Sequence, residues 1–155
     1  MSRGKQKTVI ALLAIAIVAI LAAGLLQMDR VLVWWHRGKL LSPDEGTRAK
    51  AVLALGRLGY WRSMTGLAAK VRHVESGQPV VVIGLGAASG AKEGDVAVVI
   101  RNDPIRIDHP VGVVVLTRTL PHCAWARVVL AAEGEKIQAA DEAWLLEIPW
   151  MGAAP

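Results

Sequence analysis

The chain has 155 residues, enough for about one domain of ordinary size. Hydrophobic residues make up 54% of it, more than in a typical soluble domain, and the single cysteine, Cys123, excludes an intrachain disulfide. The net charge of +5 is unevenly distributed: residues 30–72 hold nine Lys/Arg against two acids, whereas residues 75–155 hold six against ten. Because basic residues beside a membrane attract anionic headgroups, we expect lipid rather than nucleic acid to contact the positive region.

The longest uncharged stretch, residues 8–28, follows a basic tail at residues 1–7 and reads TVIALLAIAIVAILAAGLLQM. About twenty apolar residues in an α-helix span the hydrocarbon core of a bilayer, so we predict a transmembrane helix. A cleaved signal peptide is the alternative, since residues 22–24 are small. Its apolar region would normally be shorter, about 7–15 residues.

The next segment, residues 29–41, reads DRVLVWWHRGKLL and is predicted to lie at the membrane interface. Trp34 and Trp35 are expected at headgroup depth, while Arg37 and Lys39 reach the lipid phosphates. The alternative is an aromatic patch that binds another protein.

Residues 42–73 are predicted to form a pair of short amphipathic helices. Ser42 as cap, Pro43 at the first helical position and Glu45 three residues after the cap mark the start of the first helix. Two apolar stripes form a candidate protein interface: Val52, Leu55 and Leu58 on the first helix, and Met64, Leu67 and Val71 on the second. Residues 43–73 also resemble a single HEAT-like helix pair, but a solenoid needs at least three repeats.

From residue 78 to residue 150 the pattern changes to short β-rich runs separated by turn residues. The runs are residues 79–83, 96–100, 111–117, 124–131 and 143–148. Five or six strands without room for crossover helices predict a small antiparallel β-barrel or sandwich, and hence a membrane-anchored α+β protein. Runs of consecutive apolar residues indicate strands buried on both faces, with the helical pair or other chains covering the second face.

A glycine-rich segment, VVVIGLGAASG at residues 80–90, looks like the start of a dinucleotide-binding fold. That fold needs a helix after the glycines to hold the pyrophosphate, and the next apolar run follows too soon for one. We therefore interpret Gly86, Gly90, Gly94 and Asp95 as a structural turn. Gly94 is expected to have a positive φ, and Asp95 to bond nearby backbone amides.

Three parts of residues 80–148 resemble the small β-barrels of bacterial envelope proteins. They are the glycine spacing that ends at Gly94-Asp95, the strand-like VGVVV at residues 111–115, and the Ile137-x-x-x-Asp141 segment. Similar segments occur in the C-terminal domain of flagellar assembly protein T and, more distantly, in the β domain of the rod-shape protein MreC. Ala140 departs from the pattern, which has glycine before the aspartate. The resemblance implies a non-enzymatic assembly module in a bacterial envelope.

The basic residues flanking segment 8–28 are nearly balanced, so they do not decide the orientation of the chain in the membrane. The resemblance favours a cytoplasmic N-terminus and an extracytoplasmic β domain. No catalytic residue, cofactor or metal site is expected, since the four histidines lack metal-ligand spacing. Trp125, Trp144 and Trp150 are widely spaced and are interpreted as core or edge anchors rather than a base-stacking platform.

The sequence thus predicts a structural or scaffolding subunit of an envelope-associated assembly, bound to the lipid bilayer, with no enzymatic activity. Its expected partners are further copies of itself or other membrane subunits, and not nucleic acid. The alternative function is a membrane-anchored regulatory module that binds a small molecule or peptide at the β domain.

Overall fold

The computed structural model describes residues 15, 17–19, 22, 24, 28–60, 65–75, 79–104 and 108–147. Two thirds of the predicted anchor at residues 8–28 lie outside them. In the described part of the chain, no helix combines the length and apolarity needed to cross a membrane. The chain divides into two units, Met1–Trp34 and Trp35–Pro155.

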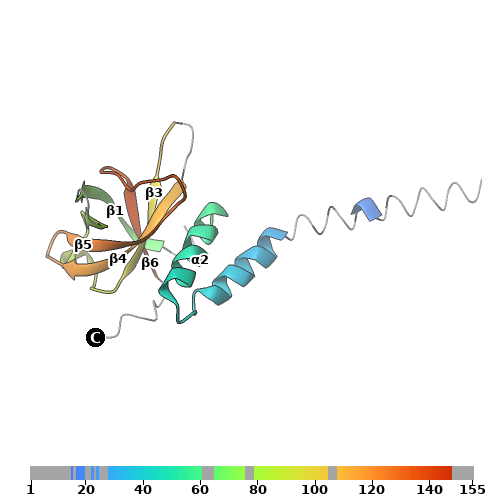
Figure 1. Ribbon diagram of the computed structural model, residues 1–155, viewed down its shortest axis with the longest axis horizontal. Coiled ribbons are helices and arrows are strands. Elements are labelled where there is room, and N and C mark those ends of the chain that lie inside the picture. Colours follow the sequence, from blue (N-terminus) through green and yellow to red (C-terminus); the bar gives the residue numbers. More distant parts are fainter. Residues whose placement is uncertain are drawn as a thin grey trace, which may run out of the picture. The chain divides into compact units, whose positions relative to one another are not determined.

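Six strands of the second unit close into an antiparallel barrel (Figure 1). The described elements are helix 28–39, α2 at Glu45–Arg57, β1 at Thr65–Val74, β2 at Val80–Ile83, the 3-10 helix η2 at Ala87–Ser89, β3 at Val96–Arg101, β4 at His109–Thr119, β5 at Ala124–Ala131 and β6 at Glu142–Leu146. Around the barrel the order is β1-β2-β5-β4-β3-β6, and β6 pairs back onto β1. The predicted α+β class is therefore confirmed, and of the two predicted β architectures the barrel is the one formed.

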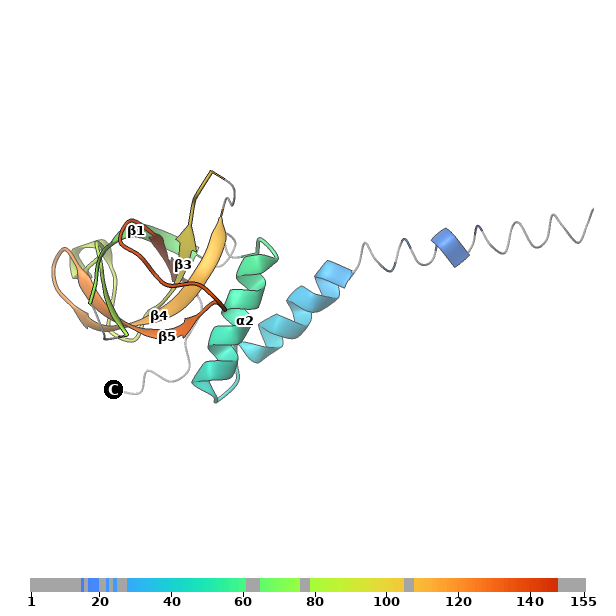
Figure 2. The same ribbon diagram turned by 45° about the horizontal axis from the view of Figure 1, so that its top comes forward.

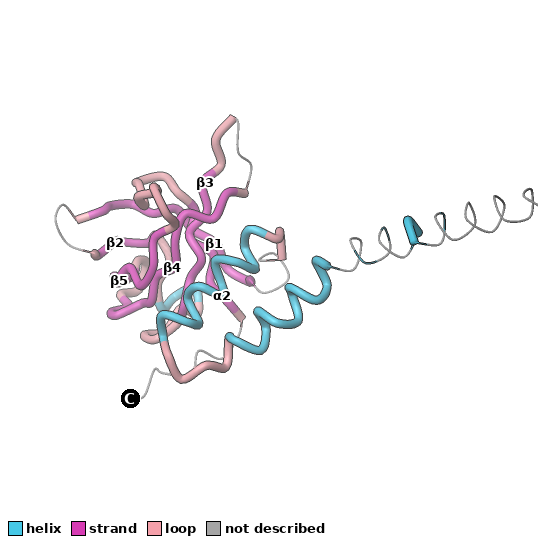
Figure 3. Tube along the Cα trace, turned by 45° about the vertical axis from the view of Figure 1, so that its right-hand side comes forward, coloured by secondary structure: helices cyan, strands magenta, loops and turns pink. Residues whose placement is uncertain are grey.

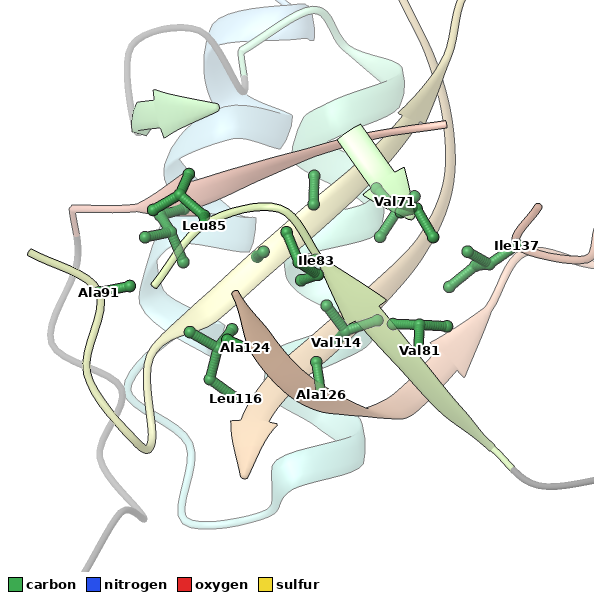
Figure 4. Packing of buried hydrophobic residues seen from close by; sticks show 14 of the residues in the cluster. Val71, Val81, Ile83, Leu85, Ala91, Val114, Leu116, Ala124, Ala126 and Ile137 are labelled. Carbon is green, nitrogen blue, oxygen red and sulfur yellow. The ribbon is translucent and has the colours of Figure 1, made fainter. Parts of the chain in front are cut away.

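The interior of the barrel is filled by small and branched apolar side chains (Figure 4). Successive side chains of a strand point to opposite faces, so every second residue enters the interior. Val81 and Ile83 of β2 are buried, whereas Val82 between them points outward. The interior cluster includes Val71, Val81, Ile83, Ala97, Val99, Val114, Leu116, Ala124, Ala126, Ile137, Ala143 and Leu145. Burial of this apolar surface is the main source of the barrel's stability.

Helix α2 covers the outer face of the barrel over β4, β5 and β3 (Figure 2). Val98 and Val113 pair across β3 and β4, lie outside the interior cluster, and are nevertheless fully buried. The prediction that strands of consecutive apolar residues are buried on both faces is thus confirmed for β3 and β4. Helix α2 and strand β4 lie so close that a Cβ added to Gly56 would be 3.1 Å from the Cβ of Pro110.

The start of α2 differs from the sequence prediction by two residues. Asp44, not Ser42, is the N-cap, and its Oδ2 accepts a hydrogen bond of 2.6 Å from the amide of Thr47. Hydrogen bonds from the Thr47 side chain and, second, from its amide lower the pKa of Asp44 below its usual value. Ser42 instead accepts from the amide of Asp44 at 3.3 Å, while the carbonyls of Ser42 and Pro43 accept from the buried Arg48 side chain.

The prediction of a second helix was wrong, because residues 65–74 form strand β1 (Figure 3). The apolar residues used for the prediction fit a helical period, but Ala69 and Val71 also alternate with Lys70 and Arg72 at period two. Pairing decides between the two periods, since β1 bonds to β2 on one side and β6 on the other. The β domain therefore begins at Thr65 rather than at residue 78, and the HEAT-like helix pair does not form.

The barrel consists of two similar halves, β1-β2-β3 and β4-β5-β6. Exchanging β1 with β4, β2 with β5 and β3 with β6 reproduces every strand pairing of the ring. The registers agree as well: the β1–β2 pairs Val71↔Ile83, His73↔Val82 and Val74↔Val81 correspond to the β4–β5 pairs Leu116↔Ala126, Arg118↔Trp125 and Thr119↔Ala124. This correspondence matches Val82 with Trp125, which pair across β2 and β5, and Val98 with Trp144, which pair across β3 and β6. The pairs Val98↔Trp144 and Val82↔Trp125 thus lie on a pseudo-two-fold axis.

Candidate functional site

The residues predicted to lie at the membrane interface belong to helix 28–39 and its C-terminal end. Trp34 is 76% exposed and Trp35 is 50% exposed, large values for tryptophan side chains. The ammonium group of Lys39 lies 3.3 Å from the centroid of the Trp35 ring, within cation–π range. Arg37 is exposed too, with its guanidinium 6.0 Å from the ring of Tyr60.

Three of the six residues of the candidate protein interface are buried within this chain itself. Val52 and Leu55 of α2 are fully buried, as expected where α2 packs against β4. Val71 belongs to the barrel interior. These three predicted interface side chains are therefore buried within the chain itself, while Leu58 and Leu67 are exposed. The remaining predicted member, Met64, lies outside the described residues.

The glycine-rich segment forms a compact connection between β2 and β3. A Cβ at Gly86 would clash with the carbonyl oxygen of Leu120, so glycine is required there. Gly90 has φ +89° and ends η2, whose three residues are the only helix in the described segment 79–104. A pyrophosphate site of the dinucleotide-binding type needs a full helix at this point.

The predicted positive φ at Gly94 is confirmed, at +88°. Its amide donates to the carbonyl of Leu116 at 2.8 Å, and the amide of Leu116 donates back to the carbonyl of Asp95 at 2.8 Å. The Oδ2 of Asp95 accepts from the amide of Lys92 at 2.8 Å, as expected for a turn aspartate. The turn therefore fastens the start of β3 to β4.

An equivalent turn precedes β6 in the second half of the barrel. The amide of Ala140 donates to the carbonyl of Val71 at 2.8 Å, and the amide of Val71 donates to the carbonyl of Asp141 at 2.7 Å. The Oδ2 of Asp141 accepts from the amide of Gln138 at 2.8 Å. Ala140 takes the place of Gly94 and has a φ of +77°, in the region that disfavours side chains.

A partly buried ionic cluster joins the end of β3 to the segment before β6. Arg101 donates from Nε and Nη2 to the two carboxylate oxygens of Asp141, each at 2.9 Å, and from Nη1 to Glu135 at 2.8 Å. Nη2 also donates to the carbonyl of Lys136. The carboxylate of Asp141 raises the pKa of Arg101, and Nε2 of His109 lies 3.2 Å from Oε1 of Glu135. The guanidinium is thus engaged at all three nitrogens by groups of this chain, which indicates a structural role.

Another surface carries exposed aromatic and basic side chains on the outside of β1, β2, β5 and β4. Trp125 is 40% exposed and pairs with Val82 across β2 and β5. Next to this pair, His73 of β1 is in register with Val82, and Arg118 of β4 is in register with Trp125. Cross-strand neighbours share one face of a sheet, so these four side chains form a row on the outer surface.

Two β-bulges flank this row at pseudo-symmetric positions. The pairing of β1 shifts between Val71 and His73, and that of β4 shifts between Leu116 and Arg118. Each shift leaves two successive side chains exposed, Arg72 with His73 on β1 and Thr117 with Arg118 on β4. A Cβ at Gly84 would lie 2.6 Å from Nε of Arg72, so the Arg72 side chain occupies the space beside Gly84, directly after the end of β2. We call Arg72, His73, Val82, Arg118 and Trp125 the bulge face.

The interpretation of Trp125 as a core or edge anchor was wrong, because its side chain is exposed and its strand is paired on both sides. The signal was present in Ala-Trp-Ala-Arg at residues 124–127, where the alternating alanines point inward and place Trp125 outside. Trp144 is half-buried, and Trp150 lies outside the described residues.

Comparison of the sequence with protein-family models gave no match, and comparison with curated proteins gave no significant similarity.

Proposed function

We propose that this chain is a non-catalytic, membrane-anchored scaffolding subunit of an envelope-associated assembly. The observation that carries the proposal is the exposure of Trp34 and Trp35 on the helix that directly follows the uncharged segment 8–28. Tryptophan at the end of an apolar segment is typical of headgroup depth. Lys39 over the Trp35 ring supplies the cation that such a position favours.

The polar groups of the barrel support a non-catalytic role. The carboxylates of Asp95 and Asp141 hold backbone amides, and the guanidinium of Arg101 is engaged by Asp141, Glu135 and a carbonyl. These groups stabilise turns and the junction of β3 with β6. In this proposal the N-terminus is cytoplasmic, and the barrel presents its surface to other subunits outside the cytoplasm.

The scaffolding role now rests on the barrel surface rather than on the helical stripes, since Val52 and Leu55 are buried within the chain. The alternative function, a regulatory module that binds a small molecule or peptide at the β domain, draws on the exposed Trp125. The two functions share a membrane anchor and differ in what the barrel binds.

Carbonate washing of native membranes tests the anchor. We expect the full-length chain to stay in the membrane pellet, because about twenty apolar residues with an internally bonded backbone are not released by high pH. Sequencing of the N-terminus gives the control, since a mature chain that begins near Leu25 would show a cleaved signal peptide. Release of the chain into the supernatant would refute the membrane-anchored function.

A further inference from the structure

We infer that the bulge face binds an acidic segment of a partner protein, which places an apolar side chain against Trp125 and carboxylates beside Arg72, His73 and Arg118. The inference rests on the proposed scaffolding function and names the chemistry of the partner. It goes beyond the anchor, which lies elsewhere in the chain.

The composition of the bulge face is that of a protein-binding surface. Trp and Arg are the residues most enriched among those that dominate binding energies, and the bulge face holds one tryptophan and two arginines within a few strands. Trp125 stands at the pseudo-two-fold axis beside Val82, so its ring and the valine offer a small apolar centre. The basic side chains of the two bulges border this centre on both sides.

The charges of the bulge face are uncompensated in the part of the chain that the structure describes. Arg72, His73 and Arg118 make no ion pair there, and all three are exposed. Cations nearby behave differently: Arg127 on the same face of β5 bonds to Glu45, and Lys70 bonds to Glu142. A carboxylate supplied by a partner is therefore the complement that the bulge face lacks.

A short acidic peptide fits better than nucleic acid or an anionic membrane. Residues 65–147 hold eight Lys/Arg against ten Asp/Glu, a net charge of −2, so the rest of the barrel repels an extended polyanion. Two arginines, one histidine and one aromatic ring suit a segment of a few residues. Because the barrel is closed, the segment must bind through side chains and cannot add itself as a strand.

The test uses the full-length chain in zwitterionic detergent micelles, labelled with 5-fluorotryptophan and observed by fluorine NMR. Trp125→Phe assigns the Trp125 resonance among the six tryptophans. The probe is a short synthetic peptide in which one leucine is flanked by runs of glutamate. We expect this peptide to shift the Trp125 resonance saturably and to leave the others in place, whereas the matching peptide with lysine for glutamate has no effect.

Charge reversal locates the binding site. Arg118→Glu should weaken binding of the acidic peptide about tenfold or more, as removal of a dominant charged contact does. Lys50→Glu, an equal charge change on the exposed side of α2, should leave binding unchanged. Unaltered resonances of the other tryptophans show that each variant folds. If Arg118→Glu does not fold, Arg72→Glu provides a second charge reversal on the bulge face.

Several outcomes would overturn the inference: no response of Trp125 to the acidic peptide, equal binding by Arg118→Glu and Lys50→Glu, or a stronger response to single-stranded oligothymidine or to phosphatidylglycerol vesicles. These results leave the anchor untouched, since carbonate washing reports on it separately. Conversely, a chain that is washed from membranes but whose Trp125 responds to the peptide refutes the membrane-anchored function and retains the binding face.

Discussion

Ala140 holds a backbone conformation that glycine adopts at lower cost. Its φ of +77° matches the +88° of Gly94 in the equivalent turn, and both amides bond to a bulged strand. For a residue with a Cβ, the left-handed region costs about 1–2 kcal/mol, part of which glycine loses again through its freedom in the unfolded chain. The two turns therefore form a natural pair for substitution.

We expect Ala140→Gly to stabilise the barrel by about 0.5–1 kcal/mol and Gly94→Ala to destabilise it by about 1 kcal/mol. Chemical denaturation of the full-length chain in detergent, followed by tryptophan fluorescence, measures both. The critical result is that the two substitutions change the free energy of unfolding in opposite directions. If Ala140→Gly lowered the free energy of unfolding, strain at this turn would not be a property of the folded chain.

For single residues, the sequence predicts which positions need a special backbone conformation better than it predicts which side chains are exposed. Gly94-Asp95 was identified because a strained turn requires a specific residue type, and such requirements are visible in a single sequence. The Ile137-x-x-x-Asp141 segment, by contrast, is singled out only through its resemblance to small β-barrels, because Ala140 stands where glycine is expected. The exposure of Trp125 depends on which face of β5 meets the interior, and tryptophan fits either environment.

Among the elements, β1 shows what a single sequence leaves undetermined. Residues 65–74 satisfy a helical and a strand period at once, because a ten-residue segment with small residues on both faces distinguishes them poorly. The deciding partners, β2 and β6, are close to it in space, but β6 lies about seventy residues away in sequence. The strands from β2 to β6 were predicted because each has its own turn residues and apolar run.

Helix α2 stabilises the barrel through Leu55, which is fully buried against its strands. We expect Leu55→Ala to reduce the free energy of unfolding by about 2–5 kcal/mol through loss of buried surface and a residual cavity. Leu58→Ala, at a position 36% exposed, is the matched control and should change it far less. Denaturation measures stability, and light scattering in detergent measures the oligomeric state. Dissociation of an oligomer by Leu55→Ala without loss of stability would restore Leu55 as an interface residue.

For the whole molecule, the side of the membrane on which the barrel lies is the main consequence of the proposal. Ala139→Cys in a Cys123→Ser chain places one reactive thiol at an exposed turn of the barrel. We expect a membrane-impermeant maleimide to label it in intact spheroplasts, because the proposed topology places the barrel on the extracytoplasmic side. Labelling only after lysis would place the barrel in the cytoplasm, and residues 30–72 would then act as the retained positive flank.

Closure of the ring by β6 sets the order in which the chain can fold during its synthesis. Lys70 of β1 and Glu142 of β6 pair across 72 residues, so β1 cannot complete its pairing until β6 has been synthesised. Such non-local pairing folds slowly. Until β6 is present, β1 and β3 each keep one unpaired edge, which can associate with other unfinished chains. Loss of Glu142–Leu146 by proteolysis or a premature stop would therefore open two edges at once and turn a self-contained domain into an aggregation-prone one.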